Sequence, residues 1–177
     1  MTNLHTATFG GGCFWCIDAA FRRVRGVHKV ESGYTGGHSN SPTYREVCSG
    51  ESGHAEVVQV HFDPAVIDYT TLLAMFFTLH DPTQLNRQGN DIGSQYRSVV
   101  YYHDSTQKQQ TEAMIAQLQT HSAAKIVTEV SPASRFYPAE DYHQDYYSEN
   151  PNQGYCSILI APKIEKFEHT FSDLLIS

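Results

Sequence analysis

The stretch Ala-Thr-Phe-Gly-Gly-Gly-Cys-Phe-Trp-Cys, residues 7–16, decides how the chain begins to fold. Ala7 to Phe9 predicts a short strand, and residues 13–23 predict a helix because apolar side chains recur along one of its faces. The three glycines between them allow a sharp turn and a close approach to Cys13. A helix start favours negative charge on a cysteine. We therefore expect Cys13 to be an exposed, activated thiol.

Further strands and helices alternate along the chain, though not in a strict pattern. We expect strands at residues 27–34, 54–62, 97–102 and 126–130, and helices at residues 69–79, 106–119, 140–149 and 164–175. Met114, Ile115 and Leu118 are expected to face inward. Residues 80–95 read as a loop, and the chain becomes irregular after Ser131. The pattern predicts a single domain over residues 1–177, an α+β two-layer sandwich around a mixed sheet with a long coiled C-terminal segment.

The strand expected at residues 54–62 places a carboxyl group among apolar side chains. Val58, Val60 and Phe62 share one face, and the alternation of a strand puts Glu56 on that same face. A carboxyl group there is desolvated, which raises its pKa and keeps it protonated near neutrality. Glu56 is therefore our candidate proton donor beside a reactive thiol.

Composition argues against several classes of function. With 12 Lys and Arg against 19 Asp and Glu, the chain carries a net charge of −7, so we expect no nucleic-acid partner. The start of the chain does not resemble a secretory signal, and no apolar stretch is long enough to span a membrane. We expect a soluble, cytoplasmic monomer.

The four cysteines leave three readings open: a catalytic thiol, a metal site or a disulfide-exchange motif. Cys13 and Cys16 could form half of a zinc site, but Cys48 and Cys156 are isolated and no paired histidines follow. We therefore expect no metal and no other cofactor. Cys13 and Cys16 also form a Cys-x-x-Cys, which suits a general thiol-disulfide oxidoreductase but leaves Glu56 unexplained.

Several motifs in order resemble the A-type family of peptide methionine-S-sulfoxide reductases. They are Gly12-Cys13-Phe14-Trp15, Ser32-Gly33-Tyr34-Thr35-Gly36-Gly37, Pro42-Thr43-Tyr44, Val47-Cys48-Ser49-Gly50, Gly53-His54-Ala55-Glu56, His80-Asp81-Pro82-Thr83, residues 91–98 and residues 136–144. The resemblance covers most of residues 9–156. It implies a ferredoxin-like core, reduction of methionine-S-sulfoxide, free or in proteins, and recycling by thioredoxin.

The resemblance also implies roles for particular side chains. Tyr44 and Tyr96 would donate hydrogen bonds to the sulfoxide oxygen. The substrate methyl group would lie against Phe14 and Trp15, and two further residues match the family site, Asp91 and His143.

A second thiol must then capture the sulfenic acid that forms on Cys13. Cys156 matches the resolving position of the family and follows a flexible loop, while Cys16 departs from the glycine that often follows the tryptophan. Our leading hypothesis is that Cys156 resolves first, with Cys16 as an alternative resolver or a relay. Cys48, expected in a short turn or helix, is interpreted as a buried bystander.

Overall fold

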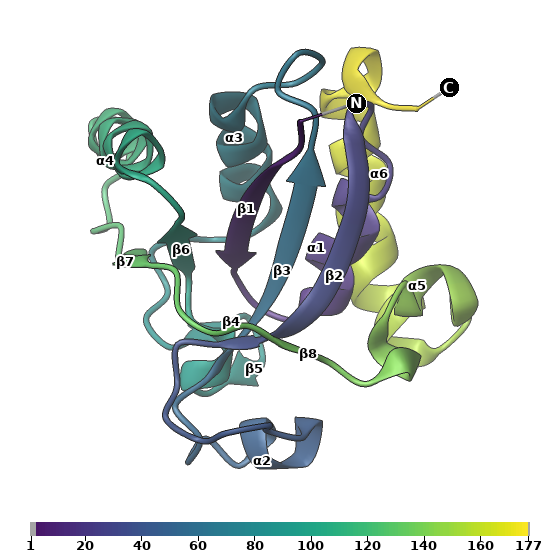
Figure 1. Ribbon diagram of the computed structural model, residues 1–177. Coiled ribbons are helices and arrows are strands. Elements are labelled where there is room, and N and C mark those ends of the chain that lie inside the picture. The colour runs from purple at the N-terminus through teal and green to yellow at the C-terminus, as the bar shows by residue number, and fades with distance from the viewer. Residues whose placement is uncertain (1–2, 177) are drawn as a thin grey trace.

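The computed structural model describes residues 3–176, and its centre is a six-stranded sheet of order β7-β6-β1-β3-β2-β8 (Figure 1). The strands are β1 (His5–Gly10), β2 (Val27–Thr35), β3 (Ala55–Phe62), β6 (Val99–Tyr102), β7 (Glu129–Pro132) and β8 (Tyr137–Pro138). Neighbouring strands are antiparallel except β6 and β7, which are parallel. The sheet is therefore mixed, as the sequence predicted.

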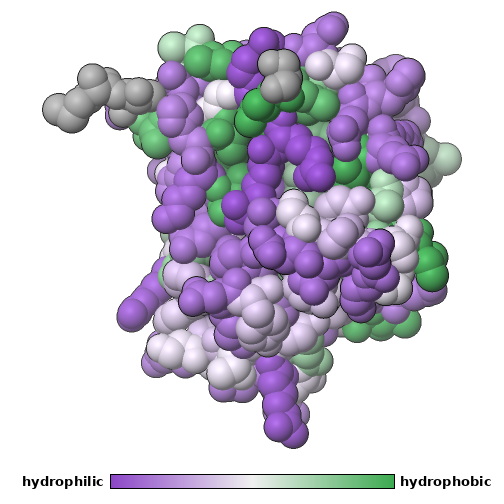
Figure 2. Space-filling model, turned by 90° about the vertical axis from the view of Figure 1, so that its right-hand side faces the viewer, coloured by the Kyte–Doolittle hydropathy of each residue, from purple (hydrophilic) through white to green (hydrophobic). Residues whose placement is uncertain are grey.

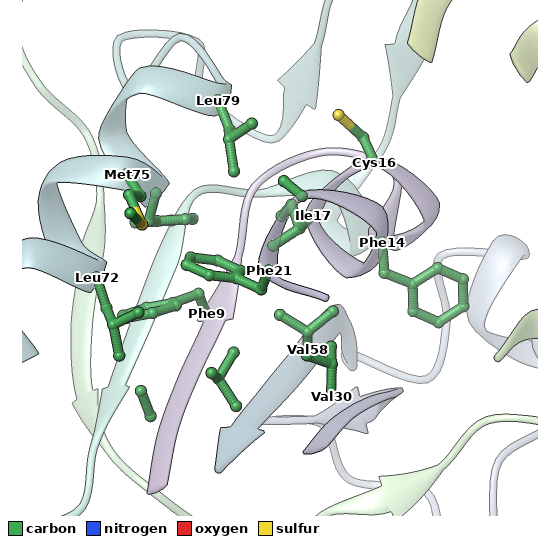
Figure 3. Packing of buried hydrophobic residues seen from close by; sticks show 14 of the residues in the cluster. Phe9, Phe14, Cys16, Ile17, Phe21, Val30, Val58, Leu72, Met75 and Leu79 are labelled. Atoms are coloured by element: carbon green, nitrogen blue, oxygen red, sulfur yellow. The ribbon is translucent and has the colours of Figure 1, made fainter. Parts of the chain in front are cut away.

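Three helices cover one face of the sheet: α1 (Phe14–Phe21), α3 (Tyr69–Leu79) and α6 (Ala161–Thr170). Figure 1 shows α1 and α6 behind β2 and β3, and Figure 3 shows the side chains that fill the space between the layers. Phe9 of β1 stacks on Phe76 of α3 with ring centroids 4.9 Å apart. Val58, Val60 and Phe62 of β3 belong to this core, which confirms the predicted alternation.

The other elements lie around this sandwich. They are α2 (Tyr44–Cys48), the β4–β5 hairpin (Arg87–Gln88 and Asp91–Ile92), α4 (Ser105–Gln119), α5 (Tyr146–Glu149), 3-10 turns at Ser94–Tyr96, Asp141–His143 and Ser172–Leu174, and a π-helical turn at Cys156–Ile160. On the opposite face of the sheet Ala55 and Val57 pack with Val99 and Tyr101. Figure 2 shows that hydrophilic residues cover most of the face on the side of α5 and α6. No helix in residues 3–176 is long and apolar enough to cross a membrane.

The α+β class is confirmed, while several element boundaries differ from the expectation. The predicted loop at residues 80–95 contains the β4–β5 hairpin, and the predicted strand at 126–130 runs instead from Glu129 to Pro132. The helix expected at 140–149 is divided because Asp145 adopts a left-handed conformation with φ 53°. α6 begins at Ala161, three residues earlier than expected, and ends at Thr170.

The helix predicted at residues 106–119 is present as α4, but its apolar side chains are less buried than expected. Met114, Ile115 and Leu118 pack against the core while staying half-buried. The fully covered positions of α4 are the polar residues Gln107 and Thr111.

Candidate functional site

Cys13 lies at the turn between β1 and α1, where it is the residue that precedes the first helical position. Its φ of −66° and ψ of 127° are extended, and the N–H of Cys16 donates a 3.3 Å hydrogen bond to its carbonyl oxygen. The turn requires glycine at the two positions before Cys13. A Cβ on Gly11 would lie 2.8 Å from the ring of His80, and Gly12 has φ +87°, a conformation that other residues rarely adopt. The turn therefore forms only with glycine here.

Glu56 of β3 faces this turn from the sheet. Its side chain is 1 % exposed, and its Oε1 accepts a 3.2 Å hydrogen bond from the backbone N–H of Phe14. Its Oε2 is buried and has no hydrogen-bond partner within the described part of the chain. Burial raises the pKa of Glu56 to about 8, the Phe14 N–H opposes the rise, and the charge of Asp91 adds to it. At neutral pH the carboxyl group is mostly protonated and has a proton to give.

The surroundings of Cys13 differ from the expectation of an exposed thiolate. The residue is only half-buried as a whole, yet burial of the thiol raises its pKa well above the usual value. The negative charges of Glu56 and Asp91 raise it further, while the N–H of Trp15 lowers it. The hydrogen bond at the helix start stabilises the Cys13 thiolate less than burial and the neighbouring carboxyl groups destabilise it. The free site therefore holds a neutral thiol.

Aromatic side chains form one wall of the site. Phe14 is fully buried and stacks on Tyr44 with ring centroids 6.4 Å apart. Trp15 stacks on Tyr146 at 3.8 Å, and its Nε1 donates a 2.9 Å hydrogen bond to Nδ1 of His143. These contacts fix both aromatic residues beside Cys13.

His143 completes this wall as a neutral ring. It is 1 % exposed, and burial lowers its pKa below the usual value. Because Nδ1 accepts from Trp15, Nε2 carries the hydrogen, and this Nε2 has no partner within the described residues.

Tyr44 and Tyr96 come from separate segments and approach the same carboxyl group. Burial raises the pKa of both hydroxyls, and Glu56 is the second cause for each. Between them lies Cys48, whose pKa is raised by burial and lowered by hydrogen bonds from the two tyrosines. Cys48 is half-buried and adjoins the site, so the expectation that it is fully buried is wrong.

Asp91 lies on the hairpin at the other side of the site, where its Oδ2 accepts a hydrogen bond from the hydroxyl of Tyr155. The pKa of Tyr155 is raised first by burial and next by the charge of Cys13. Tyr155 is therefore a neighbour of the thiol that the sequence did not single out among eleven tyrosines. Its only sequence signal is its position directly before Cys156.

The two candidate resolving cysteines are both covered and all four cysteines are free thiols. Cys16 lies on α1 and is 6 % exposed, while Cys156 is fully buried at the start of the π-helical turn. Residues 3–176 contain no group of three or more His, Cys, Asp or Glu side chains placed to hold a metal ion.

Comparisons with known proteins show which family the chain belongs to. The family model described as "Peptide methionine sulfoxide reductase" matches residues 5–175. A curated relative from Chromobacterium violaceum, "Peptide methionine sulfoxide reductase MsrA", is 55 % identical over 174 residues, covering 97 % of this chain and 99 % of the relative.

Solved structures are similar as well. Reduced Mxr1 from Saccharomyces cerevisiae has a TM-score of 0.80 at 34 % identity, covering 86 % of this chain and 89 % of Mxr1. Methionine sulfoxide reductase A of Corynebacterium diphtheriae has a TM-score of 0.77 at 36 % identity, covering 85 % and 76 %. The chain therefore belongs to the peptide methionine sulfoxide reductase family and reduces methionine sulfoxide.

Proposed function

We propose that this protein reduces the S epimer of methionine sulfoxide, free or within proteins, with Cys13 as nucleophile and Glu56 as proton donor. The observation that carries the proposal is the buried Oε2 of Glu56, which has no hydrogen-bond partner within residues 3–176. A pKa of about 8 leaves this carboxyl group protonated at neutral pH. A protonated oxygen without a partner is suited to donate to a sulfoxide oxygen.

The first half of the reaction exchanges oxygen between two sulfur atoms. Sγ of Cys13 attacks the sulfoxide sulfur as the S–O bond breaks. The sulfoxide oxygen takes up one proton from Glu56 and the proton that the Cys13 thiol gives up, so that it leaves as water. Water then attacks Sγ and gives one proton back to Glu56, which releases methionine and leaves a sulfenic acid. In sum, one thiol and one sulfoxide become one sulfenic acid and one thioether.

The remaining side chains bind and orient the substrate. The hydroxyls of Tyr44 and Tyr96 approach Glu56, where they can donate hydrogen bonds to the sulfoxide oxygen. Phe14 and Trp15 offer an apolar surface for the methyl group, fixed by the stacking contacts already described. Asp91 and His143 present polar atoms at the two sides of the site. Such an arrangement distinguishes two epimers because methyl and oxygen must point in fixed directions.

The cycle closes by an intramolecular disulfide of Cys13 with Cys156 or Cys16, followed by reduction by thioredoxin. Mxr1 from Saccharomyces cerevisiae, a structural neighbour of this chain, has also been solved in complex with Trx2. Four free thiols suit a protein of the reducing cytoplasm, and we propose that it acts there as a monomer.

Reduction of the two separated sulfoxide epimers, driven by dithiothreitol, tests the assignment. We expect wild type to reduce the S epimer and not the R epimer, and Cys13→Ser to abolish the activity. Activity that persists in Cys13→Ser would rule out Cys13 as nucleophile. Disulfide reduction without any sulfoxide reduction would favour the general thiol-disulfide oxidoreductase instead.

The Glu56→Gln variant tests the proton donor separately. Removal of a general acid costs about 10²- to 10⁴-fold in rate, so we expect methionine formation to slow by that order. Alkylation of Cys13 by iodoacetamide should persist, because a glutamine side chain keeps the shape of the site. Unchanged turnover would show that the proton comes from another group.

A further inference from the structure

Asp18 of α1 is a buried carboxylate that takes no part in the chemistry at Cys13. Its side chain is fully buried, and it accepts hydrogen bonds from Nε of Arg22 and, at 2.7 Å, from Oγ of Ser32. A third donor is the backbone N–H of Asp145, at 3.2 Å. A buried charge is unfavourable unless several donors hold it, and these three stabilise the carboxylate. The third donor connects α1 to the segment between β8 and α5.

Asp145 has an unusual backbone conformation. With φ 53° and ψ 37° it lies in the left-handed region, which residues other than glycine seldom adopt. Its own carboxyl group contributes little to this conformation, because Oδ1 lies 3.7 Å from Nε of Arg22 and has no hydrogen-bond partner within the described residues. The hydrogen bond from its N–H to the buried carboxylate of Asp18 stabilises the left-handed conformation instead.

The residues before and after Asp145 hold the indole ring of Trp15. Two positions before it, Nδ1 of His143 accepts a 2.9 Å hydrogen bond from Nε1 of Trp15. Directly after it, the ring of Tyr146 stacks on the indole, with ring centroids 3.8 Å apart and an interplanar angle of 12°. Because the left-handed residue sets the direction of the chain between these two rings, it decides whether both can contact the indole at once.

Helix α1 therefore contacts this segment at two points. Trp15 and Asp18 are three residues apart, so they lie on neighbouring turns of one face of the helix. We infer that Asp18 is a positioning residue: through the backbone of Asp145 it fixes the two rings that hold Trp15. The inference rests on the proposed function, in which Trp15 offers an apolar surface to the methyl group of the substrate.

The reacting groups themselves do not depend on this contact. Cys13 and Glu56 belong to other segments, and the hydrogen bond from the N–H of Phe14 to Glu56 does not involve Asp145. Loss of the contact between Asp18 and Asp145 therefore weakens substrate binding more than it slows the reaction of bound substrate.

Two variants of Asp145 separate the backbone conformation from the carboxyl group. Asp145→Gly and Asp145→Val both remove the carboxyl group, but glycine accepts a left-handed conformation whereas a β-branched residue resists it. Asp18→Ala removes the acceptor itself. Ser32→Ala is the matched control, because it removes a different donor to the same carboxylate. Circular dichroism first establishes that each variant is folded.

Two measurements on the full chain follow substrate binding and the indole separately. Single-turnover release of methionine from its S-sulfoxide gives the half-saturating concentration and the maximal rate. Trp15 is the single tryptophan of the chain, so its fluorescence and its quenching by acrylamide report its contacts directly.

We expect Asp145→Val and Asp18→Ala to raise the half-saturating concentration about tenfold, which corresponds to a conformational penalty of about 1.4 kcal/mol, with little change in the maximal rate. Acrylamide should quench Trp15 more strongly in both variants. Asp145→Gly and Ser32→Ala should resemble wild type in both measurements, although Ser32→Ala should be less stable. If Asp18→Ala does not fold, the pair of variants at Asp145 decides the question.

Wild-type fluorescence and half-saturation in folded Asp145→Val would overturn the inference, as would equal losses in Asp145→Val and Asp145→Gly. A purely structural role of Asp18 would lower the stability of Asp18→Ala and Ser32→Ala alike and leave Trp15 unchanged, and that result would overturn it too. Altered fluorescence with unaltered half-saturation would instead contradict the role of Trp15 in the proposed function, while its placement by Asp18 would stand.

Discussion

Glu56 and Cys13 share one dehydrated site, where a charge on either group makes a charge on the other more costly. The carboxylate of Glu56 raises the pKa of Cys13, and burial raises the pKa of both groups. A protonated Glu56 removes that repulsion at neutral pH. The acid that supplies the proton is therefore also the group whose neutral form permits the thiol to ionise during attack.

This coupling makes the stability of the fold depend on pH. Glu56 titrates at about 8 in the folded protein, against 4.5 as its ordinary value. Below pH 4.5 Glu56 is protonated in both the folded and the unfolded protein, so its titration does not change the free energy of unfolding. As pH rises from 4.5 to 8 the unfolded state loses its proton first, so folding is progressively disfavoured.

We expect Glu56→Gln to increase the free energy of unfolding at pH 7 by up to about 3 kcal/mol, because glutamine cannot ionise. The gain should vanish near pH 4. Urea unfolding of both proteins at the two pH values measures it. Equal stability of wild type and variant at pH 7 would mean that the folded carboxyl group ionises near its ordinary pKa.

At this scale some residues could be predicted from local pattern and others could not. The position of Glu56 followed from the two-residue period of a strand, which is a local property. The raised pKa of Cys13 depends on Glu56 and Asp91, which arrive from other segments. The sequence did not identify Tyr155 and Cys48 as site residues for the same reason: the side chains that they approach belong to distant segments of the chain.

At the scale of elements, the turn between β1 and α1 packs against the imidazole ring of His80. The ring of His80 lies 2.8 Å from where a Cβ on Gly11 would be. Its Nδ1 bonds to the carbonyl oxygen of Phe76 at 2.9 Å and its Nε2 to Oγ of Ser98 at 2.7 Å. Burial lowers the pKa of His80 to about 4, so the ring stays neutral. The ring cannot retreat without breaking buried hydrogen bonds.

Gly11→Ala is therefore expected to destabilise the protein by about 1–3 kcal/mol through overpacking and to slow the alkylation of Cys13. Gly154→Ala is the matched control, because nothing lies within 4 Å of its added Cβ. Thermal unfolding and the rate of iodoacetamide labelling measure the two effects. A Gly11→Ala protein as stable and as reactive as the control would show that His80 does not fix the turn.

Long periodic elements were predictable, and short ones were not. α3 has the predicted bounds Tyr69–Leu79, because its apolar residues extend over three turns. The strands of the β4–β5 hairpin have only two residues each, too few for any period to be recognised. α6 begins earlier than predicted because it continues directly from the π-helical turn. The hydrogen-bond register of such a turn cannot be recognised in the pattern of apolar side chains.

At the scale of the whole molecule, the segment after β7 crosses the sheet and closes the site. Figure 1 shows it running below the main strands to α5, on the side of the sheet opposite α4. β8 pairs with β2, and Glu140 accepts hydrogen bonds from the hydroxyl of Tyr34 and the N–H of Tyr44. Asp18 of α1 accepts a further hydrogen bond from the N–H of Asp145. A segment that the sequence predicted as coil is thus fixed by partly buried polar contacts.

Gln144 is the central contact of this segment. Its Oε1 accepts a 2.8 Å hydrogen bond from the N–H of Ser32, and its Nε2 donates to the carbonyl oxygens of Ser32 and Ala139 at 2.9 and 3.1 Å. Ser32 is fully buried in the sheet. The carbonyl oxygen of Ser32 also accepts a 2.9 Å hydrogen bond from the N–H of Ala139, whereas its N–H has Gln144 as its partner.

We expect Gln144→Ala to lower the free energy of unfolding by about 1–3 kcal/mol, because it leaves the buried N–H of Ser32 without its partner. The adjacent His143 would lose its fixed position beside Trp15, so KM for the sulfoxide should rise more than kcat falls. Gln109→Ala, at an exposed position of α4, is the control and should leave both properties unchanged. Urea unfolding and steady-state kinetics with dithiothreitol measure the two effects. Loss of stability without any change in KM would show that the segment supports the fold without positioning the substrate.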